Sequence, residues 1–218
     1  SVLVGDFLYS RAFQMMVESG QMRVIEVLAE ATNVIAEGEV LQLMNTHDAS
    51  LSEDDYLLVI RSKTAKLFEA SARLAPILAQ SDSATEQACA TYGQALGTAF
   101  QVVDDLLDYA GDSTDFGKNL GDDLRKGKAT LPLILAMQRG NEAQRQTVRE
   151  AIETGSVDKI TEIAHIVRVT GALEATRNAA AAEAQRASAA AAFRVRVSTH
   201  SRCRVCGNRS NGWAVRRV

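Results

Sequence analysis

The sequence predicts an all-α protein in which helices surround a central cavity. Apolar residues recur three and four positions apart through residues 1–192, which is the spacing of one helix face. No stretch alternates between apolar and polar residues as a half-buried strand would. Only two of the 218 residues are proline, and alanine, the best helix former, is abundant. These three observations favour helices over strands throughout the chain.

The predicted helices follow one another with short breaks. Their ranges are 1–19, 21–44, 52–67, 68–80, 83–109, 129–138, 141–154, 157–170 and 171–192. Ser52 precedes three acidic residues, a usual beginning for a helix because a serine side chain caps the first backbone N–H groups. Pro76 predicts a kink. Residues 111–127 are predicted as a loop whose glycines let the backbone approach a bound phosphate or metal.

Three aspartates lie in the longest predicted helix, which is otherwise apolar. Asp104, Asp105 and Asp108 share a face with Gln101, because residues three and four apart are neighbours on a helix. Phe, Val and Leu residues cover the remaining faces, which indicates a buried helix. The polar face is therefore predicted to line an internal cavity. A solvated acidic edge is the alternative, and the apolar surroundings argue against it.

A second group of charges follows between residues 118 and 128. It contains two acids and three lysines: Asp122, Asp123, Lys118, Lys126 and Lys128. Clustered carboxylates repel one another unless a cation lies among them. Oxygen ligands suit Mg²⁺, which proteins usually hold with a few carboxylates plus substrate phosphates, and lysines bind phosphate. The pattern predicts a magnesium and phosphate site.

Several spaced motifs resemble those of one enzyme family. They are F-Q-V-V-D-D-L-L-D at 100–108, G-K-N-L-G-D at 117–122, K-A-T-L-P at 128–132, R-S-K-T at 61–64 and G-E-V-L-Q-L at 38–43. Together they resemble the trans-isoprenyl diphosphate synthases, or polyprenyl synthetases, and their wording is most similar to the bacterial octaprenyl type. The resemblance implies an isoprenoid-synthase-type bundle of helices around a central cavity.

The resemblance also implies a reaction and its residues. A prenyltransferase condenses isopentenyl diphosphate onto an allylic diphosphate such as farnesyl diphosphate, and makes a long all-trans polyprenyl diphosphate for quinone side chains. The implied metal residues for Mg²⁺ are Asp104, Asp105 and Asp108, with Asp122 acting through water. The implied diphosphate-binding and catalytic residues are Lys63, Lys118, Lys128, Thr64 and Gln101, the last two orienting the reacting end. Structural alternatives are a surface-directed Lys63 and a Gln101 that belongs to an internal polar network.

One family feature is not found in this sequence. The family carries an earlier D-D-x-x-D, and no matching cluster precedes Lys63. We therefore expect residues 1–193 to form a polyprenyl synthase domain that lacks its N-terminal third and first helices, with little or no turnover of its own. A non-catalytic fragment or regulatory subunit that pairs with an intact synthase is the alternative function. A terpene cyclase is a weaker third reading, because it shares D-D-x-x-D but not the lysine motifs downstream.

Residues 194–218 differ from the remainder in charge. They hold seven Arg and no acid, while residues 1–193 carry a net charge of −10. The segment resembles nothing in the family, and we interpret it as a frameshifted or solvated basic tail. His200, Cys203 and Cys206 offer three zinc ligands where a structural site needs four. The arginines belong to no nucleic-acid-binding motif, so no nucleic-acid partner is predicted.

The remaining predictions concern partners and compartment. No apolar run reaches membrane-spanning length, and the cysteine spacing predicts no disulfide framework. The resemblance implies a cytoplasmic homodimer, paired through helices near the N-terminus, with peripheral membrane contact for product release. Candidate walls of a product tunnel are Phe13, Met15, Met16 and Leu28, which ordinary core packing explains equally well. His47 and His165 are interpreted as surface or boundary residues.

Overall fold

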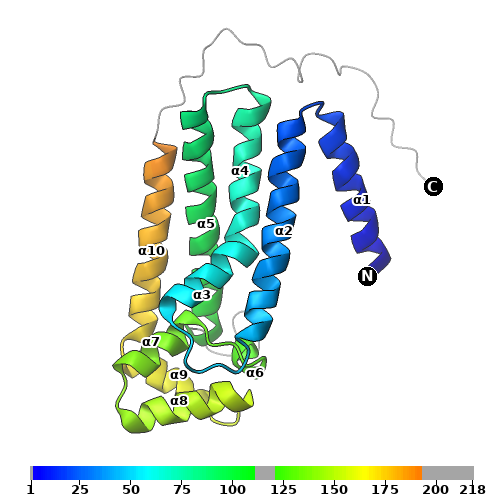
Figure 1. Cartoon of the computed structure of the whole chain (residues 1–218). Coiled ribbons are helices and arrows are strands. Elements are labelled where there is room, and N and C mark those ends of the chain that lie inside the picture. Colours follow the sequence, from blue (N-terminus) through cyan, green and yellow to red (C-terminus); the bar gives the residue numbers. More distant parts are fainter. Residues whose placement is uncertain (1, 111–120, 193–218) are drawn as a thin grey trace, which may run out of the picture.

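Long helices standing side by side form the upper part of the molecule, and shorter helices lie across their lower ends (Figure 1). The computed structural model describes residues 2–110 and 121–192, and within them it contains helices and no strand. The long helices are α1 (Val2–Glu18), α2 (Met22–Met44), α4 (Lys66–Leu78), α5 (Ser83–Ala110) and α10 (Ala172–Ala191). The shorter ones are α3 (Glu53–Ile60), α6 (Asp122–Arg125), α7 (Leu131–Arg139), α8 (Glu142–Thr154) and α9 (Ile160–Val169). The all-α prediction is confirmed.

Most helices begin where the sequence predicted. The Ser52 hydroxyl accepts a hydrogen bond from the Asp55 backbone N–H and caps α3. Asn141 and Gln144 form a reciprocal capping box at the beginning of α8. Pro132 lies in the first turn of α7, where its missing N–H costs no hydrogen bond. Local side-chain chemistry therefore sets these helix boundaries.

Two local predictions were wrong. The helix predicted to run unbroken from residue 52 to about 67 changes to a π-helical turn, η1, over Arg61–Ala65 before α4 begins. The segment predicted as loop contains the short helix α6. A π-helical turn is rare and often lies at a functional site. Here it lies where neighbouring helices pack closely against it.

Two glycines allow neighbouring helices to press against η1. A Cβ atom added to Gly38 of α2 would lie 2.6 Å from the backbone nitrogen of Lys63. A Cβ added to Gly97 of α5 would lie 2.6 Å from the Cα of Ala65. Either contact is closer than real Cβ atoms make, so only glycine permits these approaches. On a third side, Arg61 forms a 3.0 Å ion pair with Glu183 of α10.

The hydrophobic core has two parts. The larger surrounds α7, in which every residue from 131 to 137 is buried, and includes Leu124, Ile152 and Ile163. The smaller lies between α1, α2 and α4 around Val27 and Ile77. A helix that is apolar on all faces must be surrounded by others. The larger core therefore packs α7, the helix that follows α6, against the surrounding helices.

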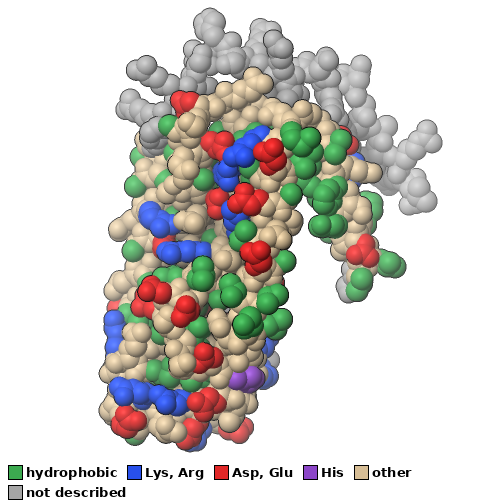
Figure 2. All heavy atoms as spheres, viewed as in Figure 1, with side chains coloured by type: hydrophobic (Ala, Val, Ile, Leu, Met, Phe, Trp, Pro, Cys, Tyr) green, Lys and Arg blue, Asp and Glu red, His purple; other side chains and the backbone are tan. Residues whose placement is uncertain are grey.

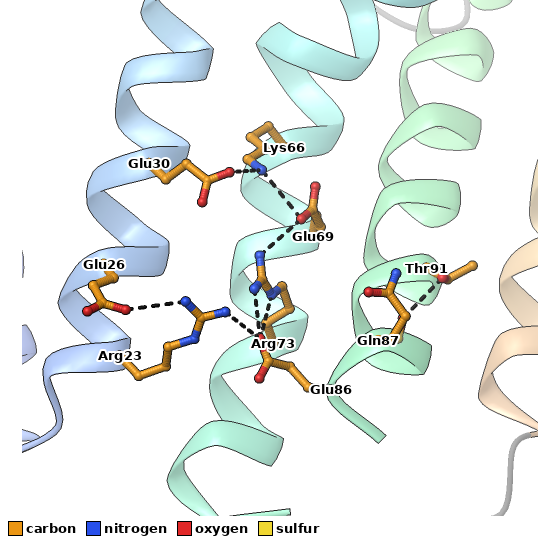
Figure 3. A network of polar contacts seen from close by, with 9 residues as sticks. All are labelled: Arg23, Glu26, Glu30, Lys66, Glu69, Arg73, Glu86, Gln87 and Thr91. Atoms are coloured by element: carbon orange, nitrogen blue, oxygen red, sulfur yellow. Dashed lines mark hydrogen bonds and ion pairs between the residues drawn. The ribbon is translucent and has the colours of Figure 1, made fainter. Parts of the chain in front are cut away.

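A network of ion pairs joins α2, α4 and α5 (Figure 3). Arg73 of α4 contacts Glu86 of α5 at 2.7 Å, and Lys66 of α4 contacts Glu30 of α2 at 3.0 Å. Glu69 lies between the two cations and contacts both. The hydrogen bond from Arg73 lowers the pKa of Glu86. The cations are mostly buried and the pairs share partners, so the network is expected to contribute more than isolated surface pairs do.

Helix α1 has many exposed apolar side chains, and Figure 2 shows them gathered at that side of the molecule. Of the four predicted tunnel-wall residues, Phe13 and Met15 are exposed, Met16 is buried, and Leu28 packs against the smaller core. Within the described ranges, no helix is long and apolar enough to cross a membrane.

Candidate active site

A cavity of about 210 Å³ opens between α2, the α3–η1 segment, α5 and residues 128–130. Both polar and apolar side chains line it. The lining residues are Gln42, Asn45, Leu51, Tyr56, Val59, Ile60, Lys63, Thr64, Gln101, Asp104, Asp105, Lys128, Ala129 and Thr130. Six of the residues predicted from sequence are among them: Lys63, Thr64, Gln101, Asp104, Asp105 and Lys128. The tertiary structure thus brings together three segments far apart in the sequence.

Helix α2 holds the Lys63 ammonium in place. The Lys63 Nζ lies 3.0 Å from Glu39 Oε2 and donates a 3.1 Å hydrogen bond to Gln42 Oε1. Gly38, one residue before Glu39, allows the close packing of α2 against η1. The G-E-x-x-Q spacing therefore has a physical reason: the glycine brings the helices together, and the two polar residues bind the lysine.

A chain of hydrogen bonds crosses the cavity wall from α3 to η1 through α5. The Tyr56 hydroxyl donates to Asp105 Oδ2 at 2.6 Å, and Gln101 Nε2 donates to Asp105 Oδ1 at 2.9 Å. The Thr64 hydroxyl donates in turn to Gln101 Oε1 at 2.9 Å. Asp105 and Gln101 each make two of these hydrogen bonds, so the four side chains form one connected network.

Burial dominates the electrostatics of this wall. It raises the pKa of Asp105 to about 7, against the lowering effect of the hydrogen bonds from Tyr56 and Gln101. Burial also raises the pKa of Tyr56 well above its usual range, and the Asp105 carboxylate raises it further. Tyr56 is therefore protonated at neutral pH and can serve as the donor to Asp105.

The other predicted metal residues are Asp108, near the end of α5, and Asp122, the first residue of α6. Asp108 is buried and accepts a 3.1 Å hydrogen bond from the Asp123 backbone N–H, and Asp122 forms an ion pair with Arg125. Burial raises the pKa of Asp108. Neither Asp108 nor Asp122 lines the cavity. Of the four predicted aspartates, Asp104 and Asp105 thus line the cavity, whereas Asp108 and Asp122 do not.

The donor set fits a metal that arrives with phosphate better than a metal held by protein alone. Within residues 2–110 and 121–192, no three His, Cys, Asp or Glu side chains are arranged to hold a metal ion. Asp104 lines the cavity that Lys63 and Lys128 also line, so a carboxylate and two cations face the same space. Mg²⁺ bound by few carboxylates completes its coordination with phosphate oxygens and water.

Known proteins resemble this chain in sequence over most of its length. Residues 1–169 match the polyprenyl synthetase family. The chain belongs to the polyprenyl synthetase family. It is 53% identical over 181 residues to the octaprenyl diphosphate synthase of Escherichia coli (strain K12), covering 83% of this chain and 56% of that protein. It is 44% identical over 174 residues to the all-trans-nonaprenyl-diphosphate synthase (geranyl-diphosphate specific) of Rhodobacter capsulatus, covering 80% and 53%. The chain thus spans about half the length of these relatives.

Solved structures of polyprenyl synthetases share the fold. The decaprenyl diphosphate synthase from Rhodobacter capsulatus superposes with a TM-score of 0.81 at 46% identity, covering 88% of this chain and 60% of that one. The polyprenyl synthase from Caulobacter crescentus CB15, complexed with calcium and isoprenyl diphosphate, gives 0.81 at 47% identity, covering 88% and 59%. The isoprenoid-synthase-type fold predicted from the motifs is therefore confirmed.

In this polyprenyl synthetase chain, a junction around His47 fixes the segment that carries Lys128. The His47 backbone N–H donates to the Gly127 carbonyl at 2.8 Å. Its ring nitrogen Nδ1 lies 2.9 Å from the Ile152 carbonyl, so this nitrogen carries the proton. Gly127, next to Lys128, has a φ of 68° and packs directly under the ring. His47 is thus a structural surface residue, as predicted, and His165 is exposed.

Sequence reasoning missed several residues of the cavity. It assigned no role to Tyr56 or Asn45, which line the cavity, and it counted Asp123 among the clustered charges without identifying its partner. Asp123 Oδ1 accepts a 2.8 Å hydrogen bond from Lys128 Nζ. Tyr56 could have been suspected, because it precedes Lys63 by two helical turns and a buried tyrosine hydroxyl needs a partner. Lys118, predicted to bind diphosphate, lies outside the described residues, as does the tail from residue 194.

Proposed function

We propose that this chain carries the prenyl-transfer site of a long-chain polyprenyl diphosphate synthase. The reaction joins isopentenyl diphosphate to an allylic diphosphate such as farnesyl diphosphate, and the all-trans product serves as a quinone side chain. The observation that carries the proposal is the cavity in which Lys63, Lys128 and Asp104 face one space beside Thr64 and Gln101.

The cations of the cavity suit a leaving diphosphate. Lys63 and Lys128, together with Lys118, bind the diphosphate and stabilise the negative charge that develops as the allylic bond breaks. Thr64 and Gln101 orient the reacting end of the substrate. Apolar side chains of Val59, Ile60 and Ala129 keep water away from the allylic cation that forms.

Magnesium fits the oxygen donors of this site. Asp104 is the carboxylate that we assign to the metal, while Asp108 lies one turn further along α5 and Asp122 is the first residue of α6. Asp105 is also a predicted metal ligand, although both of its oxygens already accept hydrogen bonds, one from Tyr56 and one from Gln101. When bound, Mg²⁺ supplies additional positive charge to the departing diphosphate.

The partner that best fits the exposed apolar face of α1 is a second copy of a polyprenyl synthetase chain. Val4, Phe7, Leu8 and Val17 are all more than half exposed on this helix. Pairing of such faces is favoured because it removes apolar surface from water. The proposal of a homodimer through the N-terminal helices rests on this face, and the cytoplasm is expected on the family resemblance alone.

A second candidate function is a non-catalytic subunit that pairs with an intact synthase. It is favoured by one observation: in the described part of the chain, no three acidic side chains are arranged around one metal. We accordingly expect slow turnover from this chain alone. Such a subunit would still bind diphosphate through Lys63 and Lys128.

Two measurements on the full chain separate these functions. The first follows transfer of labelled isopentenyl diphosphate onto farnesyl diphosphate with Mg²⁺. The second follows binding of inorganic pyrophosphate with Mg²⁺ by calorimetry. Turnover that falls roughly 10²-fold or more in Lys63→Ala supports the enzyme. Binding without turnover supports the subunit, and the absence of both rejects both functions. Lys159→Ala, which removes an exposed lysine outside the cavity lining, is the matched control.

A further inference from the structure

One buried polar contact of the cavity wall is made by Tyr56, a residue to which the proposed function assigns no role. Tyr56 is 3% exposed, and Asp105, its partner, is also 3% exposed. Their 2.6 Å hydrogen bond joins α3 to α5 at the cavity wall. A buried carboxylate is costly unless donors satisfy it, so this contact constrains both helices.

The hydrogen bonds that link Tyr56, Asp105, Gln101 and Thr64 depend on one another in direction. A carboxylate accepts, so the Gln101 side chain turns its Nε2 toward Asp105. The opposite end of the amide, Oε1, then faces Thr64 and accepts the proton of its hydroxyl. Rotating the amide by half a turn would place an N–H against Thr64 and an oxygen against Asp105. Asp105 opposes that rotation, because its carboxylate accepts from Tyr56 and Gln101 and would be placed against an oxygen of the rotated amide.

We propose that Tyr56 is a positioning residue, which acts through Asp105 to hold the Gln101 amide and the Thr64 hydroxyl in a single orientation at the cavity wall. Asp105 is the link in this arrangement, since Tyr56 and Gln101 occupy one oxygen each. The proposal deepens the proposed function and rests on it in one respect: it takes Gln101 and Thr64 to contact the reacting end of the substrate.

The effect of Tyr56 is therefore selective. Lys63 is held by Glu39 and Gln42, and Lys128 by Asp123, without help from Tyr56. Removing the Tyr56 hydroxyl should leave these two cations in place and free only the Gln101 amide and the Thr64 hydroxyl. Binding of a bare diphosphate should not change, whereas binding of an allylic diphosphate should weaken.

The test compares Tyr56→Phe with Tyr109→Phe in the full chain. Tyr109 is also fully buried, and its hydroxyl faces Thr130 without reaching hydrogen-bond geometry. Both variants thus remove one buried hydroxyl, but only Tyr56→Phe removes a hydrogen bond to Asp105. In protein labelled with ¹⁵N at glutamine side chains, hydrogen exchange of the Gln101 amide, assigned with Gln101→Glu, should accelerate roughly tenfold in Tyr56→Phe. It should not change in Tyr109→Phe.

Calorimetry gives the second readout. With Mg²⁺ present, the Kd for farnesyl diphosphate should rise several-fold in Tyr56→Phe while the Kd for inorganic pyrophosphate is unchanged. An unchanged Gln101 exchange rate overturns the proposal, and so does an equal loss of both ligands, which indicates a merely structural tyrosine. If the unmodified chain binds neither ligand, the proposed function fails, and the exchange comparison alone decides whether Tyr56 positions Gln101.

Circular dichroism of each variant is recorded first. If Tyr56→Phe does not fold, Asp105→Asn takes its place. An asparagine has the shape of aspartate but cannot accept equally at both positions, so the same acceleration of Gln101 exchange is expected.

Discussion

The backbone of Gly38 lies against the backbone nitrogen of Lys63, so closely that a Cβ atom would come within 2.6 Å of it. This contact sets the distance between α2 and η1, and with it the reach of Glu39 and Gln42 to the lysine ammonium. The position of the principal cation of the site thus depends on a residue that has no side chain.

Gly38→Ala is expected to destabilise the protein by ~1–3 kcal/mol, because the added methyl group overpacks the α2–η1 contact. It should also weaken binding of pyrophosphate with Mg²⁺, since Lys63 is displaced. Urea unfolding and calorimetry measure the two effects. Gly5→Ala is the control: Gly5 is also helical, but nothing lies within 4 Å of the added Cβ. That change should be neutral or stabilising, and equal effects at both positions would contradict the prediction.

Asp104→Asn is expected to abolish the calorimetric signal that Mg²⁺ gives with inorganic pyrophosphate. The reason is that Asp104 supplies a carboxylate oxygen to the cavity that Lys63 and Lys128 line. Mg²⁺ alone should give little heat, because a site with few carboxylates needs phosphate oxygens to complete the coordination. Asp54→Asn removes an exposed aspartate on α3 and should leave the signal intact. A full signal from the Asp104 variant would exclude this carboxylate as a ligand.

The metal-free protein should lose stability as the pH rises from about 4 to about 7 through the titration of Asp105. Its pKa in the folded chain is about 7, mainly because of burial, and in the unfolded chain it is near 4. The folded state therefore binds the proton more tightly than the unfolded state, so its advantage is full below pH 4 and is lost as the pH passes 7. Asp108 acts in the same direction.

Denaturant unfolding at several pH values, with a chelator present, measures this loss of stability. Asp105→Asn should flatten the profile between pH 5 and 8 because it removes the titrating group. A profile that is equally steep in this variant would assign the effect to other groups.

Gly127→Ala should cost more stability than Gly20→Ala, although both residues have nearly the same backbone angle. Their φ values are 68° and 67°, so each alanine carries a similar penalty of ~1 kcal/mol for a left-handed conformation. Only at Gly127 does the new Cβ also collide with the His47 ring, whereas nothing lies within 4 Å at Gly20. The difference in the free energy of unfolding between the variants therefore isolates the His47 contact. Equal losses would show that the ring moves aside freely.

Local sequence determined most of the helices. Ser52, Asn141 and Pro132 fix helix beginnings through their own side chains and backbone. The spaced motifs also placed the chain in its family and named six residues that line one cavity. The helix beginnings depend on neighbours a few positions away, and the motifs are read from their resemblance to a known family, which is why a single sequence reveals both.

Only the tertiary structure decided how those residues act. The π-helical turn at η1 lies where Gly38 and Gly97 allow two other helices to pack against it. The residues within η1 do not predict these contacts, because the glycines lie on other helices. Asp105 and Asp104 are adjacent in sequence and looked equivalent, yet Asp105 is bound by Tyr56 from another helix. A carboxylate's role depends on which donors and charges surround it, and those come from segments up to 49 residues away along the chain.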